Sequence, residues 1–334
     1  MNGTPLITWI LPVRNGMPYL MRTLQSIQAQ TYRNHRCLVW DNGSTDGTLA
    51  CLQAYIPEKI PGEIVSGRPL TLAASLAALV ERATSEYIAR IDADDIALPS
   101  RLAEQVKRME SEASLVALGT RTELIDELDQ RIDDEWELPL GDAEIRWRNL
   151  WQGSVLHPSL MYRRPAVLDA GNYREIKAED HDLWLRLGRI GRFDNLPQKL
   201  MRYRRHQSNT TVAVTDFFAY NELAATNNAA TLFDGFDATR AMDLWHAAYP
   251  RVGERGVFPR HLAELSRAAI GAARTVGERD GYFSETTYYK RQRRFLLVNI
   301  LRTALRLDPK GIESATSAFS RWRKASAKEL VKDG

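Results

Sequence analysis

The chain has 334 residues, of which 44% are hydrophobic and 26% charged, the composition of a soluble globular protein with one large or two modest domains. Its two cysteines supply neither a disulfide framework nor the spacing of a metal site, so we expect a reduced, cytoplasmic protein. No signal peptide and no run of 18 apolar residues is visible, which argues against a segment that crosses a membrane.

The net charge of +3 is unevenly spread along the chain. Residues 289–334 hold 12 Lys and Arg against 4 Asp and Glu, and the remainder is net acidic. Within this tail, residues 289–307 align apolar side chains along one helical face beside arginines, a pattern typical of helices that lie on anionic membranes. Packing against the rest of the protein or a partner subunit is an equally open interpretation. The stretch lacks a nucleic-acid-binding motif, so no nucleic-acid partner is expected.

Strand-like and helix-like segments alternate through the first third of the chain. The expected strands span residues 6–11, 36–40, 63–66 and 87–91. The expected helices span residues 19–30, 48–55, 72–83 and 99–109. Pro12 is expected to end the first strand. Such alternation predicts an α/β fold, a mostly parallel sheet with helices on both faces, whose ligands bind beyond the carboxyl ends of the strands.

The pattern changes after about residue 111, where strands become less regular. The further elements expected are strands at 115–118, 121–125 and 196–204 and a helix within 173–187. Beyond residue 216 the chain is helix-like and rich in alanine, which predicts a C-terminal helical extension. The chain is therefore divided into residues 1–110, 111–215 and 216–334.

Three carboxylates, Asp92, Asp94 and Asp95, follow the apolar strand at residues 87–91. Partly buried carboxylates repel one another and lose hydration, and a divalent cation offsets both costs. Mg²⁺ and Mn²⁺ are typically held by one or two carboxylates together with substrate phosphates. The cluster therefore predicts a site for a metal-bound diphosphate. The alternative is that Asp95 only caps the following helix.

Two more acidic groups follow a predicted strand or open a predicted helix. Asp41 begins a polar turn after the strand at 36–40 and has the chemistry to accept a hydrogen bond from a nucleobase or a ribose hydroxyl. Glu179 and Asp180 open the helix within 173–187, where the helix dipole favours carboxylates. A carboxylate there can point into the crevice and act as a general base that takes a proton from an attacking hydroxyl. A polar turn and ordinary first-turn residues are the simpler interpretations of these two features.

Basic and imidazole side chains form the third group. Arg204 and His206 lie in a cationic run after the strand at 196–204, where they would hold a diphosphate or complete a metal site. A solvated basic loop is the alternative. His157 is either a structural histidine or an acceptor-site residue. Since no glycine-rich phosphate loop is present, a diphosphate here would be met by metal and side chains.

The ordered set of these segments resembles the family 2 inverting glycosyltransferases of the GT-A fold. The matching stretches are residues 10–16, 41–48, 87–95, 179–187 and 203–206. The resemblance covers about residues 5–210. It implies a Rossmann-like sheet whose first 110 residues bind the nucleotide-sugar and whose residues 111–215 bind the acceptor. It also implies metal-dependent transfer of a sugar to a hydroxyl group, with inversion at the anomeric carbon.

Site residues are carried over by position. Pro12, Val13 and Asn15 would line the base pocket, Asp41 would bind the base, Asp92 the ribose and Arg204 the diphosphate, with Arg68 also reaching the nucleotide. Asp94 and His206 would hold Mn²⁺ or Mg²⁺. Asp180 would be the catalytic base, and Glu179, His157 and Trp184 would line the acceptor site. The chain departs from the family at Asn42, where an aspartate is common, and at Ala77, where an asparagine is common.

The resemblance also implies the partners. A UDP-sugar is the expected donor of a hexosyl or N-acetylhexosaminyl group, with dTDP and GDP still open. The expected acceptor is a glycan or a lipid-linked glycan in bacterial surface polysaccharide synthesis, which would place the protein in the cytoplasm, at the inner face of the membrane. Two other functions are weighed against this one. A non-catalytic nucleotide- or sugar-binding module would not need Glu179 and Asp180, and a sugar nucleotidyltransferase would need a glycine-rich basic loop after the first strand.

Overall fold

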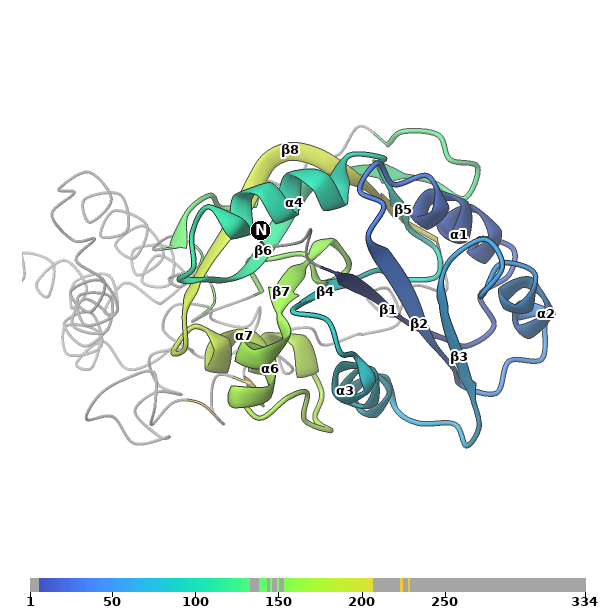
Figure 1. The fold of residues 1–334 in the computed structure, drawn as a ribbon, viewed down its shortest axis with the longest axis horizontal. Helices are drawn as coiled ribbons and strands as arrows, with labels where there is room; N and C mark the ends of the chain where they lie inside the picture. Colours follow the sequence, from blue (N-terminus) through green and yellow to red (C-terminus); the bar gives the residue numbers. More distant parts are fainter. Residues whose placement is uncertain are drawn as a thin grey trace, which may run out of the picture. The chain divides into compact units, whose positions relative to one another are not determined.

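A computed structural model describes residues 6–132, 138–142, 145, 149, 153–206, 223, 224 and 228 (Figure 1). The chain divides into two compact units, Met1–Ala224 and Ala225–Gly334. Apart from residues 223, 224 and 228, the expected helical extension at 216–334 and its basic helix at 289–307 lie outside the described residues. In the part that is described, no helix has both the length and the apolar character needed to span a bilayer.

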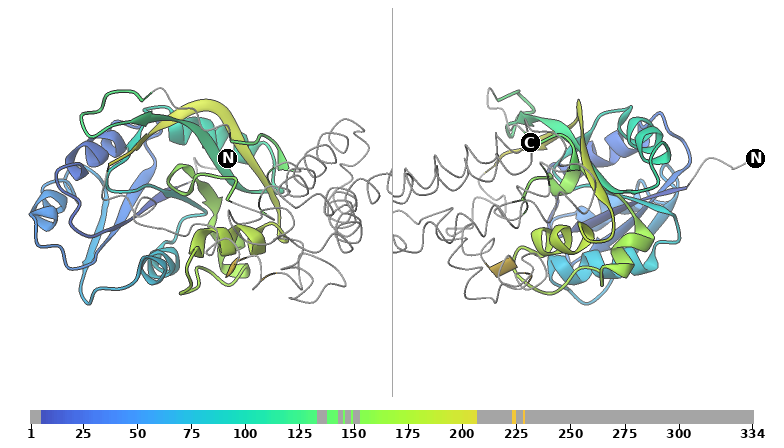
Figure 2. Two further views of the ribbon diagram at one scale, coloured as in Figure 1. Left: turned by 180° about the vertical axis from the view of Figure 1, so that it is seen from behind. Right: turned by 90° about the vertical axis from the view of Figure 1, so that its left-hand side faces the viewer.

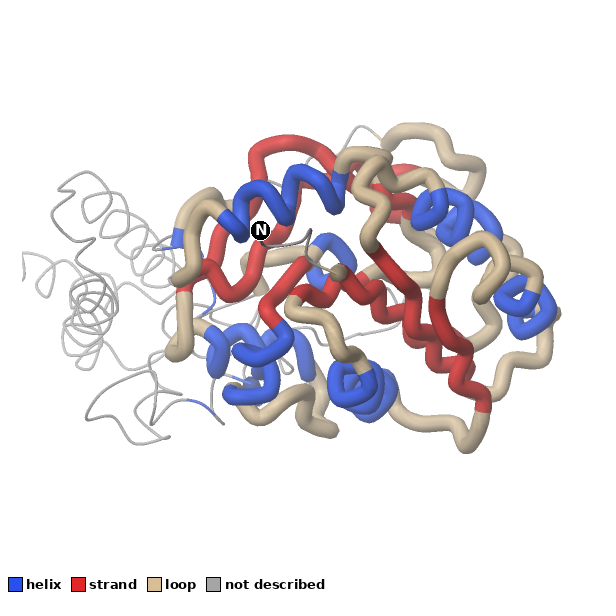
Figure 3. Tube along the Cα trace, viewed as in Figure 1, coloured by secondary structure: helices blue, strands red, loops and turns tan. Residues whose placement is uncertain are grey.

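Eight strands of the described residues form one sheet, in the order β3-β2-β1-β4-β7-β6-β8-β5. The strands are β1 (Ile7–Val13), β2 (His35–Asp41), β3 (Gly62–Ser66), β4 (Tyr87–Arg90), β5 (Ile96–Ala97), β6 (Leu115–Ile125), β7 (Met161–Arg163) and β8 (Arg192–Arg204). The helices are α1 (Leu20–Gln28), α2 (Thr48–Gln53), α3 (Leu72–Arg82), α4 (Arg101–Glu110), α6 (Arg164–Asp169) and α7 (Glu179–Leu187), and a 3₁₀ turn spans His157–Ser159 (Figure 3).

The first half of the sheet is parallel and sets the position of the site. β1 pairs in parallel with β2 and β4, and β2 with β3. The register places Val13 beside Asp41 and Ile10 beside Arg90. Because the carboxyl ends of these strands lie at one edge of the sheet, the loops that follow Val13, Asp41 and Arg90 converge there.

The second half of the sheet is mixed. β7 runs antiparallel to β4 and β6, whereas the long strands β6 and β8 run parallel with shifts in register. These two long strands lie side by side (Figure 2). β8 then pairs antiparallel with β5, so that Arg202 lies beside Ile96. This last pairing returns the end of β8 to the acidic turn that precedes β5.

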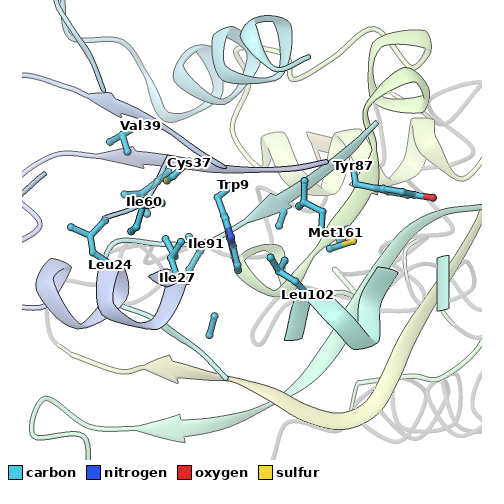
Figure 4. Packing of buried hydrophobic residues seen from close by; sticks show 14 of the residues in the cluster. Trp9, Leu24, Ile27, Cys37, Val39, Ile60, Tyr87, Ile91, Leu102 and Met161 are labelled. Carbon is cyan, nitrogen blue, oxygen red and sulfur yellow. The ribbon is translucent and has the colours of Figure 1, made fainter. Parts of the chain in front are cut away.

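Both faces of the sheet are covered by helices, as expected (Figure 1). Side chains alternate along β1: Trp9 and Leu11 join the cluster packed by α1, α2 and α4, and Ile10 joins the cluster packed by α3, α6 and α7. All three are fully buried. Figure 4 shows Trp9 among residues of the first cluster, beside Ile27 and Leu102. Burial of an aliphatic side chain such as Leu11 or Ile10 stabilises the fold by about 1.5–3 kcal/mol. This burial holds in place the strand ends that carry the polar loops.

Three local expectations are corrected. β1 continues through Pro12 to Val13. Proline has no N–H to donate, but none is needed at Pro12 because β4 pairs with β1 only as far as Ile10. The strands expected at 115–118 and 121–125 form one strand, β6, with a register shift between Thr120 and Arg121. Asp95 does not cap the next helix, since α4 begins at Arg101 after Ser100.

Candidate functional site

The acidic turn after β4 gathers its three carboxylates in one place. Asp92, Asp94 and Asp95 each offer an oxygen, and these oxygens lie within 4.8 Å of one another. The hydroxyl of Thr23 in α1 contacts the backbone of this turn: its Oγ1 lies 2.9 Å from the carbonyl oxygen of Ala93 and 2.8 Å from that of Asp95. Thr23 therefore holds the turn through its backbone carbonyl groups, and its hydroxyl does not use the carboxylates.

The burial of Asp95 suits this cluster to a divalent cation. Its side chain is fully buried, Oδ1 accepts the backbone N–H of Arg204 at 3.0 Å, and Oδ2 has no hydrogen-bond partner among the described residues. Burial, followed by the charges of Asp94 and Asp92, raises the pKa of Asp95 well above its usual value. Burial also raises the pKa of Asp92, although Arg90 opposes the shift. A cation would stabilise the ionised carboxylates, so the residues fit Mn²⁺ or Mg²⁺.

β8 brings His206 to this turn from more than a hundred residues away. His206 Nε2 lies 2.8 Å from Asp94 Oδ2, and its ring stacks on Tyr19 with the centroids 5.1 Å apart. The two residues expected to hold the metal are therefore neighbours in the structure.

Arg204 differs from its expected role. Its side chain is fully buried, and the guanidinium donates to the carbonyl oxygens of Asp94 (2.9 Å) and Asp126 (2.7 Å) while it lies 4.5 Å above the ring of Tyr19. These contacts hold the acidic turn in place. The guanidinium of Arg204 is thus buried against the backbone of the acidic turn. This placement does not support the expected direct contact with a diphosphate.

The loops expected to hold the nucleotide are tied to each other. Asn15 donates its backbone N–H to Ser44 Oγ at 2.9 Å, and Asn15 Oδ1 accepts the N–H of Thr45 at 2.8 Å. Asp41 is 2% exposed and uses Oδ1 for the N–H and hydroxyl of Ser44. Pro12 and Val13 are buried in β1 just behind these loops. The structure thus brings together the four residues assigned to the base pocket.

Arg68 and Asn42 belong to the neighbouring loop. Asn42 Oδ1 accepts the N–H of Leu70 at 2.8 Å, and its amide donates to Ser75 Oγ of α3 at 3.0 Å. The asparagine that departs from the family pattern therefore fastens β2 to α3, a task that needs both a donor and an acceptor. Arg68 precedes this anchored backbone and is exposed, free to reach a ligand.

Glu179 and Asp180 open α7, after Ala178 in the left-handed region (φ 58°). Asp180 Oδ1 accepts the N–H of His181 at 2.7 Å, and the Asp180 side chain is 37% exposed. Burial, followed by the charge of Asp180, raises the pKa of Glu179 to about 7. The charges of Asp180 and Asp92 act on each other, so the start of α7 lies near the acidic turn.

Two residues expected to contact the acceptor are buried instead. Trp184 is 1% exposed and packs edge-on against His157, with the ring centroids 5.3 Å apart. His157 is 7% exposed; Nε2 lies 2.8 Å from the hydroxyl of Tyr173, and Nδ1 lies 4.0 Å from Asp180 Oδ2. The expectation of direct acceptor contact therefore does not hold for Trp184, which supports the site from the core side.

Arg90 is a site residue that the sequence reasoning missed. It is 3% exposed and donates to Asp92 Oδ2, and its charge also acts on His157 and Glu179. An arginine inside the apolar strand at residues 87–91 was the available signal, because a buried cation requires a partner. Arg90 therefore contacts the acidic turn directly, and its charge also reaches the start of α7.

The overall fold is shared with two solved structures. S. aureus TarS residues 1–349, in complex with UDP-GlcNAc, matches with a TM-score of 0.59 and 14% identity, covering 96% of this chain and 92% of that one. The mannosyltransferase PcManGT from Pyrobaculum calidifontis, in complex with GDP-Man and Mn²⁺, matches with a TM-score of 0.51 and 16% identity, covering 91% and 87%. With its mostly parallel sheet and flanking helices, the protein has the GT-A fold.

Sequence relatives give the family. The family model described as glycosyl transferase family 2 matches residues 8–171. The putative glycosyltransferase EpsE of Bacillus subtilis is 32% identical over 215 residues, 61% of this chain and 74% of that relative. The amylovoran biosynthesis glycosyltransferase AmsE of Erwinia amylovora is 30% identical over 189 residues, 55% and 70% respectively. The chain belongs to glycosyl transferase family 2 and is a glycosyltransferase.

Proposed function

We propose that this glycosyltransferase is a metal-dependent, inverting enzyme that moves a hexosyl or N-acetylhexosaminyl group from a UDP-sugar to a hydroxyl of a glycan or lipid-linked acceptor. One observation carries the proposal. Asp94 and His206, a carboxylate and an imidazole, meet at an acidic turn whose charges also act on Asp180, a partly exposed carboxylate at the start of α7.

The donor side follows from the loops at the edge of the sheet. The nucleotide base lies against Pro12, Val13, Asn15 and Asp41, whose loops are already tied to each other. Asp92, oriented by Arg90, accepts from the ribose hydroxyls. Asp94 and His206 would hold the divalent cation. When bound, the cation supplies Lewis-acid stabilisation of the negative charge that develops on the departing diphosphate.

The acceptor side follows from α7. Asp180 Oδ2 takes the proton of the acceptor hydroxyl, and the oxygen attacks the anomeric carbon from the face opposite the diphosphate. The new carbon–oxygen bond forms as the bond to phosphate breaks, and the electron pair leaves with the diphosphate. One displacement of this kind inverts the anomeric centre. Glu179, with its raised pKa, lies beside Asp180 as the acceptor-binding carboxyl.

Support for the partners comes from proteins similar to this chain. AmsE is a glycosyltransferase of amylovoran biosynthesis, which favours a polysaccharide acceptor. TarS is in complex with UDP-GlcNAc and PcManGT with GDP-Man and Mn²⁺, which favours a nucleotide-sugar donor and a divalent metal. Work on a lipid-linked acceptor would take place at the cytoplasmic face of a membrane, where we place the protein.

The test is release of nucleoside diphosphate from a panel of UDP-GlcNAc, UDP-glucose, UDP-galactose, dTDP-glucose and GDP-mannose, with Mn²⁺, with Mg²⁺ and with EDTA. Water serves as acceptor in this assay, so no acceptor needs to be known. The proposal expects metal-dependent release from a UDP-sugar and loss of release in EDTA. Binding of donors without release under any condition would favour a non-catalytic binding module. Formation of a nucleotide-sugar from a sugar phosphate and a nucleoside triphosphate would favour a nucleotidyltransferase.

A further inference from the structure

A buried chain of hydrogen bonds leads from the core to the start of α7. The hydroxyl oxygens of Tyr162 and Tyr173 lie 3.2 Å apart, and the Tyr173 hydroxyl lies 2.8 Å from His157 Nε2. His157 Nδ1, on the other side of the ring, faces Asp180 Oδ2 at 4.0 Å. All three ring residues are buried, and none of them has a direct part in the mechanism given above.

The charge state of His157 limits it to one proton on the ring. Burial, followed by the nearby charge of Arg90, lowers the pKa of His157 well below its usual value, so the imidazole is neutral at pH 7. A neutral imidazole donates from one nitrogen and accepts at the other. Trp184 packs edge-on against the ring and restricts its rotation, so the two nitrogens keep their separate neighbours.

The neighbours decide which nitrogen carries the proton. A lone pair at Nδ1 would face the carboxylate of Asp180 and be repelled, whereas an N–H there is attracted. Nε2 then accepts from the Tyr173 hydroxyl, and the Tyr173 oxygen accepts from Tyr162. Every donor in the chain points toward Asp180 in this arrangement.

We infer that His157 is a positioning residue that donates Nδ1–H to the Asp180 carboxylate, with its tautomer fixed by Tyr173 and Tyr162. The inference rests on the proposed role of Asp180 as the base. Asp180 Oδ1 is taken by the N–H of His181, so Oδ2 is the oxygen that His157 orients. The present 4.0 Å exceeds a hydrogen bond, and catalytic hydrogen bonds often tighten only once substrate is bound. Because the Asp180 side chain is 37% exposed, it has room to rotate and close the gap.

The tautomer is tested without turnover, by ¹⁵N NMR of the full chain labelled at its six histidines. The His157 signals are those that vanish in His157→Asn. The inference expects an Nδ1–H tautomer that persists through pH 7, and a mixture of tautomers in Tyr173→Phe. An Nε2–H tautomer in the wild-type protein overturns it. Tyr87→Phe is the matched control, because Tyr87 is another buried tyrosine whose hydroxyl bonds a carboxylate, that of Glu110.

Kinetics test the positioning role with two substitutions of His157, by Asn and by Gln, whose side-chain amides differ in length. The amide nitrogen of Asn occupies the place of Nδ1, and that of Gln the place of Nε2. With the nucleotide-sugar active in the panel, His157→Asn should retain kcat within about threefold, and His157→Gln should lose about 10- to 100-fold, the worth of one hydrogen bond to a charged group. KM for the nucleotide-sugar should be unchanged in both. Equal kcat in the two variants, at equal thermal stability, would overturn the inference.

Failure of the inference and failure of the proposed function remain distinguishable. Full activity in Asp180→Asn would remove the base from the proposed function, and the His157 tautomer would still decide the positioning contact. If the panel gives no product, the tautomer in the wild-type protein and in Tyr173→Phe decides the inference alone.

Discussion

At the scale of single residues, the candidate site holds several carboxylates close together and few cationic side chains to offset their negative charge. Asp92, Asp94 and Asp95 share one turn, and Glu179 and Asp180 lie close enough for their charges to act on it. Arg90 is the buried cation that contacts Asp92 directly. Such a cluster is stable only if protons or a metal ion neutralise part of it, which links catalysis, metal binding and pH.

Asp180→Asn should retain nucleotide binding and lower the turnover number by about 10²- to 10⁴-fold, because the amide cannot accept the acceptor's proton. Nucleoside diphosphate release measures the rate, and calorimetry with UDP and Mn²⁺ measures binding. Asp169→Asn, which makes the same change at an exposed position of α6, is the control and should be fully active. Near-normal turnover in Asp180→Asn would remove Asp180 from this role.

Asp94→Ala should abolish metal-dependent nucleotide binding, because the cation loses a carboxylate that lies beside His206. Titration of UDP by calorimetry, with Mn²⁺ or with EDTA, checks this. The wild-type protein should bind UDP more tightly with Mn²⁺, and the variant should bind equally weakly in both. An affinity that matches the wild type in both conditions would contradict the assignment.

Glu179 should make the stability of the protein depend on pH. Its pKa of about 7 in the folded protein lies above the ordinary glutamate value, so folding favours the protonated carboxyl. The associated stability is fully present below about pH 4.5 and is lost as the pH rises through 7. Glu179→Gln has no such loss, so its stability relative to wild type should rise by about 2 kcal/mol between pH 5 and pH 8. Urea unfolding of both proteins at the two pH values checks the sign; a constant difference would argue against the raised pKa.

At the scale of elements, the site depends on strand ends that are fixed by neighbouring helices. α1 reaches the acidic turn through Thr23, α3 is fastened to the end of β2 through Asn42, and β8 returns Arg204 and His206 to the same place. Each contact joins a loop to a rigid element, which holds the polar side chains in position before a ligand arrives. The turn that carries the proposed metal ligand Asp94 therefore depends on residues outside the proposed ligand set.

Thr23→Val tests this dependence. The substitution preserves shape but removes the hydroxyl shared by the carbonyl oxygens of Ala93 and Asp95, so it should destabilise the fold by about 1–3 kcal/mol. It should also weaken the effect of Mn²⁺ on UDP binding. Thr84→Val, at an exposed threonine, is the control and should change stability by less than about 0.5 kcal/mol. Equal effects of the two substitutions on Mn²⁺ dependence would show that Thr23 does not hold the turn.

At the scale of the whole molecule, the first unit carries the sheet and every described residue of the site. Its parallel half presents the nucleotide loops, and its mixed half supplies α7 and the end of β8. The basic segment at 289–307 lies outside the described residues, so its role remains a prediction from the sequence.

That segment predicts binding to anionic membranes. Flotation with vesicles of phosphatidylcholine and phosphatidylglycerol should recover the full-length chain and leave a chain that ends at Glu285 behind, because the basic amphipathic face is then missing. Added salt should weaken the recovery. Equal behaviour of the two chains would favour the alternative, a helix packed against protein.

Much of this protein was determined by sequence alone. Alternation of apolar strands and helices gave the α/β class and most element positions, since local periodicity reports which side chains face a core. The spacing of Asp92 and Asp94 after an apolar strand, and the carboxylates at the start of α7, predicted the centre of the candidate site. Such features depend on neighbours in the chain, so the sequence displays them directly.

Only the tertiary structure decided which distant residues meet and which are buried. Pairing of β8 with β5 places His206 on Asp94 and buries Arg204 beneath the turn, and packing of α7 turns Trp184 into the core. The bond of Arg90 to Asp92 and the approach of His157 to Asp180 likewise appear only in three dimensions. The physical reason is that a polar side chain's role depends on its burial and its partners, and both come from chain segments far away in sequence.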